Sequence, residues 1–279
     1  LDFTATFGET VTVTGTPRVS LTIGSTSRNA DYLSGSGSSA LVFRHTVLAG
    51  DADTDGLAVS SPVALNSGTI KDAAGNDAAL TFTAPSTAGV KVDTTAPTIT
   101  SVTVPAAATY RTSQSLTFTV NLSENVTVNT VGGVPSLSLT IGSTARSAAY
   151  ESRDGTTALT FSYVITAGEL DTDGIVVASP LVLNSGTIRD EAGNDLVLTF
   201  TAPGASTVLV DAVAPTITGV SKPADASYRA GQNLDFTLTF SESVAVVTTG
   251  GQPFLAVTVG STSRQAGYSS GNGTSALVF

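Results

Sequence analysis

The sequence predicts an all-β protein made of tandem immunoglobulin-like antiparallel β-sandwich repeats. Three observations support this prediction. Short apolar runs alternate with polar residues at period 2, and no stretch shows helical spacing over three turns. Gly, Asn and Asp turns separate the runs. The text also repeats, since LTIGST begins at Leu21 and again at Leu139, 118 residues later.

The repeat holds at further landmarks. LNSGTI begins at Leu65 and Leu183, which are also 118 residues apart. The run LDFT at Leu1 and LTFT at Leu116 are 115 residues apart, because the second copy has three extra residues near Gly132. An active site is needed once per molecule, whereas a spacer or a multivalent surface uses many copies of one unit. Repetition therefore favours a structural or multivalent role.

Ala-Pro pairs at residues 96–97 and 214–215 divide the chain. We expect residues 96–213 to be one complete repeat of about 118 residues, long enough to bury its own core. Residues 1–95 read as a repeat without its first strand, and residues 214–279 as a repeat truncated on its C-terminal side. We expect the chain to be a window on a longer array.

The strands of residues 96–213 follow in order. The first is expected over Thr98–Val104, and the second alternates over Leu116–Leu122. The third covers Leu137–Ile141, and a later one covers Leu159–Ile165 with Phe161 on the buried face. Seven to nine short strands in a unit of this length are typical of an immunoglobulin-like sandwich, although the Cys and Trp core of antibody domains is absent.

The junctions read VDTTAPTIT from Val92 and VDAVAPTIT from Val210. Proline fixes its own φ and holds the preceding residue extended, so these junctions are short and stiff. We expect a rod-like array.

Composition excludes several classes. The net charge is −10 and the chain has only 12 Lys and Arg residues, which argues against binding to nucleic acid. No Cys is present, so the protein has no disulfide, and no apolar run approaches the length of a membrane span.

Acidic residues recur at equivalent places in the repeats. Carboxylates at alternate positions before a turn glycine are the oxygen ligands that Ca²⁺ prefers, and the EF-hand glutamate is missing, so an EF-hand is excluded. The boundary aspartates and the Ser-Glu pairs that end the second strand complete the candidate set. The candidate metal ligands are Asp51, Asp53, Asp55, Asp72, Asp77, Asp93, Glu124, Glu169, Asp171, Asp173, Asp190, Asp195, Asp211 and Glu242.

Strand counting predicts that Asp171, Asp173, Asp190 and Asp211 meet Glu242 at the junction between the second and third repeats. Carboxylates gathered at one hinge repel one another unless a cation lies between them. We therefore expect an interdomain Ca²⁺. The alternative is that these residues make ordinary turns and keep a long fibre soluble.

The order of these motifs is informative. D-x-x-A-P-T-I-T is followed by a strand ending in Ser-Glu, then by L-T-I-G-S-T and D-x-A-G-N-D. This text resembles the bacterial Ig-like tandem repeats of giant secreted adhesins and of biofilm or surface-fibre proteins, over the whole chain. Asp93 and Asp211 beside acidic loops also resemble the cadherin arrangement, in which Ca²⁺ stiffens interdomain joints, although the longer D-x-N-D-x-x-P linker of cadherins is absent. The resemblance implies an extracellular or bacterial cell-surface location.

Catalysis has little support. His45 is the only histidine, and Tyr163 occupies its place in the next repeat, so we expect His45 to fill a strand position. No Cys nucleophile, G-x-S-x-G, H-E-x-x-H or phosphate loop is present. Arg28, Arg146 and Arg264 recur, and we expect them to pair with a neighbouring acid across strands.

Three functions remain open. The first is a non-enzymatic spacer or stalk of a bacterial adhesin or surface filament, which supports cell adhesion or a biofilm matrix. The second is a module that binds glycans or cells, and the third is an accessory domain of a secreted polysaccharide hydrolase. The absence of Trp disfavours glycan binding. The expected partners are neighbouring repeats of the chain, other copies in a fibre or matrix, and host or surface glycans bound through other domains.

Overall fold

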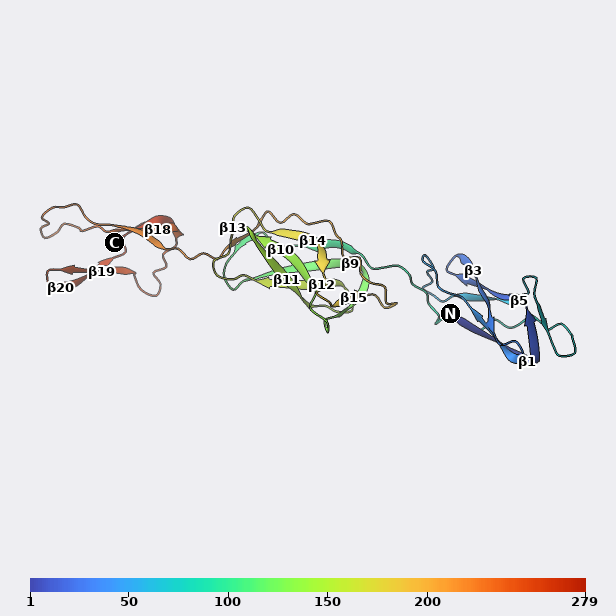
Figure 1. The fold of residues 1–279 in the computed structure, drawn as a ribbon. Coiled ribbons are helices and arrows are strands. Elements are labelled where there is room, and N and C mark those ends of the chain that lie inside the picture. Colours follow the sequence, from blue (N-terminus) through green and yellow to red (C-terminus); the bar gives the residue numbers. More distant parts are fainter.

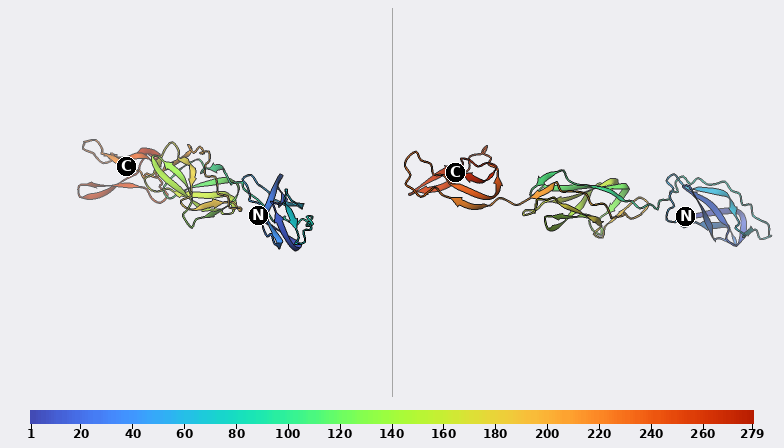
Figure 2. Two further views of the ribbon diagram at one scale, coloured as in Figure 1. Left: turned by 45° about the vertical axis from the view of Figure 1, so that its right-hand side comes forward. Right: turned by 90° about the horizontal axis from the view of Figure 1, so that it is seen from above.

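The structure is a computed structural model that describes all 279 residues. It contains 21 strands and no helix, and the strands pair antiparallel except for β8 and β16, which are parallel, so the all-β prediction is confirmed. The strands form three groups that follow one another along an elongated chain (Figure 1; Figure 2). Residues 1–95, 96–213 and 214–279 are called the first, middle and third units below.

The middle unit has the largest core. One sheet has the strand order β14-β10-β11-β12-β9-β15, with β7 also paired to β9, and a small sheet has the order β13-β16-β8. The strands are β7 (Ile99–Thr103), β8 (Ala108–Tyr110), β9 (Ser115–Asn129), β10 (Ser136–Ile141), β11 (Thr144–Ser152), β12 (Thr156–Val164), β13 (Leu170–Asp171), β14 (Val176–Val182), β15 (Thr187–Arg189) and β16 (Val208–Asp211).

Alternation on β9 builds this core. Leu116, Phe118 and Val120 are completely buried, while the residues between them are exposed or half-buried. They belong to a cluster of 23 buried residues. Phe161 on β12 is also completely buried and meets Tyr150 edge to face, with 5.7 Å between the ring centroids. The predicted burial of Phe161 is therefore confirmed.

The first unit has a sheet of order β5-β2-β3-β4-β1-β6 over a cluster of 12 buried residues. Its strands are β1 (Asp2–Thr14), β2 (Arg18–Ile23), β3 (Thr26–Ser34), β4 (Ser38–Arg44), β5 (Ala58–Ala64) and β6 (Thr69–Lys71). β1 corresponds to β9 and pairs with β4 in the same way that β9 pairs with β12. Nothing in the first unit corresponds to β7.

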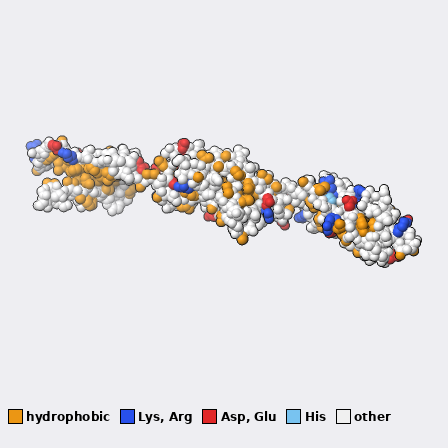
Figure 3. Space-filling model, viewed as in Figure 1, with side chains coloured by type: hydrophobic (Ala, Val, Ile, Leu, Met, Phe, Trp, Pro, Cys, Tyr) orange, Lys and Arg blue, Asp and Glu red, His pale blue; other side chains and the backbone are white.

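The third unit is the least buried. It consists of β17 (Ile217–Ser221), β18 (Thr237–Val244), β19 (Phe254–Val259), β20 (Thr262–Gly267) and β21 (Thr274–Val278). Its buried cluster has only three residues, and several large apolar side chains face solvent. Figure 3 shows these side chains gathered on the unit that carries β18–β20.

The strand count differs from the expectation. The middle unit has ten strands, because β8, β13 and β15 are segments of only two or three residues that join loops to the sheets. The segment 196–207 forms no named strand, yet it places the buried Leu196 and the half-buried Leu198 and Phe200 against the core. This segment crosses the unit once more from one end to the other. That crossing determines at which end each acidic turn lies.

Residues 96–213 expressed alone should fold as a monomeric all-β domain, because they contain their own complete core. In that fragment Phe161→Ala should lower the free energy of unfolding by about 3–5 kcal/mol, since it leaves a large cavity. Val176→Ala removes a side chain that is 56% exposed and should change stability by less than about 1 kcal/mol. Denaturant titration measures both, and equal losses would contradict the assignment of the buried face.

Candidate metal site at the first joint

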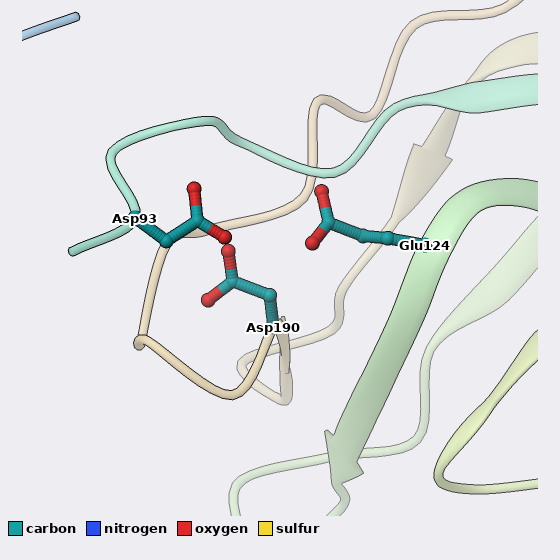
Figure 4. Close-up of side chains that lie close together, drawn as sticks. All are labelled: Asp93, Glu124 and Asp190. Atoms are coloured by element: carbon teal, nitrogen blue, oxygen red, sulfur yellow. The ribbon is translucent and has the colours of Figure 1, made fainter. Parts of the chain in front are cut away.

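Three carboxylates from separate segments converge where the first unit meets the middle unit. Asp93 belongs to the linker, Glu124 to β9, and Asp190 to the turn after β15 (Figure 4). One oxygen from each lies within 4.8 Å of the others. Two oxygen ligands on opposite sides of Ca²⁺ are about 4.6–5.2 Å apart, so this spacing is compatible with a shared cation.

Asp190 is held by its own turn. The amide of Asn194 donates to Oδ1 at 2.8 Å, and Asn194 Nδ2 donates to Oδ2 at 2.7 Å. Gly193 at the turn has φ +95°, a conformation that other residues rarely adopt. The side chain of Asp190 is only 5% exposed, so its charge is fixed in a buried position.

The linker is bound to the same turn. Asn194 Nδ2 also approaches the carbonyl oxygens of Asp93 at 3.3 Å and Thr95 at 3.4 Å. The amide of Thr95 donates to Asp93 Oδ1 at 2.8 Å, which orients that carboxylate. One amide side chain therefore connects the aspartate turn of the middle unit to the linker that enters it.

Ser123 fixes the other side of the joint. Its amide donates to the carbonyl of Thr98 at 2.9 Å, and its hydroxyl accepts from the amide of Thr98 at 2.9 Å. The same exchange recurs at the second joint, between Ser241 and Thr216 at 2.8 and 3.0 Å. The serine of each Ser-Glu pair thus anchors the linker, and the next residue carries the carboxylate.

The electrostatics of the site favour a cation. Burial raises the pKa of Glu124, and the nearby charges of Asp93 and Asp190 raise it further. Burial also raises the pKa of Asp190, but hydrogen bonds from Asn194 and from the amides of the turn outweigh this effect and hold it below its usual value. None of the three carboxylates has a salt bridge to Lys, Arg or His. Such a site can hold a hard cation that prefers oxygen ligands.

The aspartates of the DADTDG and ELDTDG loops have a different role. Asp53 accepts hydrogen bonds from the amides of Gly24 at 2.6 Å and Gly56 at 2.7 Å. Asp171 accepts the equivalent bonds from Gly142 at 2.6 Å and Gly174 at 2.7 Å. Each carboxylate ties its loop to a hairpin turn, and both of its oxygens already have protein donors.

The first acidic residue of each loop lies in a buried polar network. Asp51 is completely buried and accepts from Arg28 Nε at 2.7 Å, His45 Nε2 at 3.1 Å and the Leu48 amide at 2.9 Å. In the middle unit Glu169 takes this place, with Arg146 and Tyr163 as donors.

This network tests two predictions. The recurring arginine does pair with an acid at Arg28 and Arg146, although the acid comes from a loop and not from a facing strand. His45 lies just after β4, only 5% exposed, and its Nδ1 is 3.0 Å from the carbonyl of Asn29. The prediction that His45 fills a strand position is therefore wrong by one residue, because His45 follows the last residue of β4 and its ring joins the polar network at Asp51.

The remaining candidates are separated from the cluster. Asp77 pairs with Lys71 and Asp195 pairs with Arg189, both at 2.6 Å, and Asp55 and Asp173 are exposed. Asp72 is bound by Asn76 as Asp190 is by Asn194. Asp211 and Glu242 are the second-joint counterparts of Asp93 and Glu124, and residues 214–279 hold no counterpart of the AGND turn.

The prediction that Asp190 joins Asp171, Asp173, Asp211 and Glu242 is wrong. Asp171 and Asp211 do lie at one end, because β13 pairs with β16 there. Asp190 lies at the opposite end, beside Asp93, because the chain crosses the unit once more over residues 196–207 before it reaches β16. Strand counting omitted that crossing, although Leu196, Leu198 and Phe200 alternate with exposed residues along it.

Two residues that position the site were not singled out as such from the sequence. Asn194 and Ser123 orient the linker without being acidic, whereas the candidates predicted from the sequence are all carboxylates. The sequence does contain a signal for both residues, because Asn76 and Ser241 occupy the equivalent positions in the neighbouring repeats.

Comparisons with protein families, with characterised proteins and with solved structures gave no match. The structure contains no helix with the length and apolar character that crossing a membrane requires.

The Asp51 network should make stability depend on pH. The Leu48 amide, with His45 and Arg28, lowers the pKa of Asp51 to about 2. A lowered folded-state pKa gives stability that is present above the unfolded pKa of about 4 and is lost as the pH falls towards 2. Asp51→Asn should therefore cost about 1–3 kcal/mol at pH 7, and this difference should shrink between about pH 4 and 2.

Asp55→Asn is the matched control, because Asp55 lies in the same loop and is exposed. Thermal unfolding across pH measures both variants. A difference between wild type and Asp51→Asn that stays constant from pH 7 to 2 would contradict the charged role of Asp51.

Proposed function

We propose that this chain is a non-enzymatic spacer or stalk, made of tandem Ig-like β-sandwich repeats, from a bacterial extracellular adhesin or surface filament. The observation that carries the proposal is the linker bound to the following unit at Asn194 and Ser123, with equivalent serine contacts at both joints. Joints that repeat with the same contacts give a chain with little freedom between units. A stiff chain of this kind can hold a binding domain away from a cell surface or form part of a biofilm matrix.

Ca²⁺ at the first joint is part of this proposal. Asp93, Glu124 and Asp190 would supply three carboxylate oxygens from the linker and two segments of the middle unit. A cation that they share would remove their mutual repulsion and connect the linker to β9 and to the turn at Asp190. The joint would then bend less and resist proteolysis better.

The alternative is a module that binds glycans or cells, including one that is accessory to a secreted hydrolase. The two large aromatic residues that are exposed, Tyr228 at 40% and Phe254 at 54%, both lie in the third unit. No exposed group of aromatic side chains recurs in the units with larger cores, and glycan-binding faces normally present one. The stalk is therefore the function that the chain supports best.

Calcium titration tests the joint. Ca²⁺ should bind the whole chain with a Kd of about 10⁻⁵–10⁻³ M, because only three carboxylates contribute charge. It should raise the melting temperature and narrow the distribution of lengths in small-angle scattering. Asp190→Asn should abolish these effects, whereas Asp173→Asn, which removes an exposed acid at the other end, should leave them intact. Equal responses of the two variants would exclude the joint site.

Glu124→Gln should change stability in opposite directions with and without calcium. In EDTA it should stabilise the chain by up to about 1 kcal/mol, because it removes one of three neighbouring negative charges. In saturating Ca²⁺ it should be less stable than wild type, because it lacks one ligand. Paired melting curves measure the crossover, and a variant that is less stable in both conditions would show that Glu124 has a purely structural role.

A further inference from the structure

The only histidine of the chain lies in the buried polar network at Asp51. His45 is only 5% exposed, and both nitrogens of its ring contact oxygen atoms. Nδ1 is 3.0 Å from the carbonyl oxygen of Asn29 on β3, and Nε2 is 3.1 Å from Oδ2 of Asp51. A carbonyl oxygen and an ionised carboxylate accept hydrogen bonds and donate none. Each ring nitrogen therefore faces an acceptor.

The doubly protonated ring is the form that satisfies both contacts. A neutral imidazole has one N–H group, so it can donate to Asn29 or to Asp51 but not to both. Its other nitrogen would then point a lone pair at an oxygen about as close as a hydrogen-bond acceptor. Turning the ring over would replace both nitrogens by carbon atoms and lose both contacts. The positions of the two acceptors thus favour the imidazolium ion.

The charges next to the ring favour its proton, although burial opposes it. Asp51 stays ionised, because the amide of Leu48, with His45 and Arg28, lowers its pKa to about 2. Arg28 is the opposing cation, since its Nε donates to Oδ1 of Asp51 at 2.7 Å. Its side chain is 28% exposed, so water screens its charge more than that of the fully buried carboxylate. The nearest charge to the ring is therefore negative.

The other charged groups on the neighbouring elements have partners of their own or are exposed. The nitrogen of Leu1 donates to the carbonyl oxygen of His45 at 2.8 Å. The remaining groups are Arg44 paired with Asp2, Arg18 paired with Asp31, Asp53 bound by the amides of Gly24 and Gly56, and the exposed Asp55 and Lys91.

The middle unit builds the same network without a histidine. Tyr163 occupies the position of His45, and Glu169 occupies the position of Asp51. The hydroxyl of Tyr163 donates to Oε1 of Glu169 at 2.6 Å, and the amide of Thr166 donates to Oε2 at 2.9 Å. Burial raises the pKa of Tyr163, and the bond to Glu169 raises it further. The phenol therefore keeps its proton at neutral pH.

The loop that contains Asp51 binds the linker to the middle unit. The amide of Asp53 donates to the carbonyl of Val92 at 2.6 Å, and the amide of Val92 donates back at 2.9 Å. The hydroxyl of Thr94 donates to the carbonyl of Asp51 at 2.9 Å and accepts from the amide of Gly50 at 3.0 Å. The side chain of Asp51 thus fixes a loop whose backbone holds the linker where it leaves the first unit.

We propose that His45 makes the first joint sensitive to pH, because the protonated ring keeps the Asp51 loop on the linker and loss of a ring proton releases it. A charged form that the folded state favours adds stability at low pH, and this stability is lost as the pH rises. For a histidine the loss falls between about pH 6 and 8. The middle unit keeps its loop in place over that range. The inference goes beyond the stalk function and depends on the His45 network alone.

Nitrogen NMR of the whole chain in EDTA tests the protonation, because the chain has a single imidazole. Both ring nitrogens should carry a proton at about pH 6, and the folded ring should lose a proton at a higher pH than the ring of the same chain in urea. Asp51→Asn removes the carboxylate and should bring the two titrations together. A folded ring that titrates at the same pH as in urea, or below it, overturns the proposal.

Hydrogen exchange in EDTA tests the effect on the linker. The protection factors of the Asp53 and Val92 amides should fall about tenfold or more between about pH 6 and 8, since a hydrogen bond to a charged group is lost. Asp171 and Val210 pair at the same place in the middle unit and serve as the internal control, with protection factors that stay constant. Equal responses of the two pairs would exclude a role for His45.

An exchange of residues between the repeats makes the test specific. The double variant His45→Tyr, Asp51→Glu gives the first unit the pair of the middle unit, and it should remove the pH dependence at Asp53 and Val92. The matched control Asp55→Asn changes an exposed acid of the same loop and should keep the wild-type response. A folded double variant that keeps it as well assigns the response to another group. If the double variant does not fold, the two wild-type measurements still decide, and neither depends on calcium.

Discussion

The alternation of side chains along β9 is the constraint on which the rest of the middle unit depends. Its first half supplies Leu116, Phe118 and Val120 to the core and pairs with β12 and β7. It then presents Ser123 and Glu124 at the end where the linker enters. A shift of one residue in its register would turn both features to the wrong face. Core formation and the joint are therefore set by the same strand.

The buried and clustered carboxylates of the chain fall into two classes, according to their hydrogen-bond donors and their neighbours. Asp53, Asp171 and Asp51 are saturated by amides, an arginine and a histidine, so they stabilise loops and leave little capacity for a cation. Asp93 and Glu124 have no cationic partner. Asp190 also has amide donors on both oxygens, but it lies beside Asp93 and Glu124, with one oxygen of each within 4.8 Å of the others. Identical residue types in similar turns thus have different chemistry, because only the second group gathers negative charge without a compensating cation.

Much of the fold could be predicted from the sequence, but less of the site. Period-2 alternation predicted the burial of Phe161 and the all-β class, because it reflects a local property of each strand. The wrong grouping of Asp190 has a topological cause, since the traverse over residues 196–207 carries few strand hydrogen bonds. Whether a carboxylate is saturated also depends on donors far away in sequence, such as Gly24 for Asp53. Spacing alone does not carry that information.

The joint and β7 form one continuous element, because the linker passes through Pro97 and Thr98 directly into Ile99. Tension along an extended chain would enter the middle unit at this end of β7 and would load its pairing with β9. The contacts of Thr98 with Ser123 and of Asn194 with the linker lie before the first residue of β7. They would therefore carry the load first. A cation between Asp93, Glu124 and Asp190 would add a bond at the same point, which connects metal binding to the mechanical stability of β7 and not only to the angle between units.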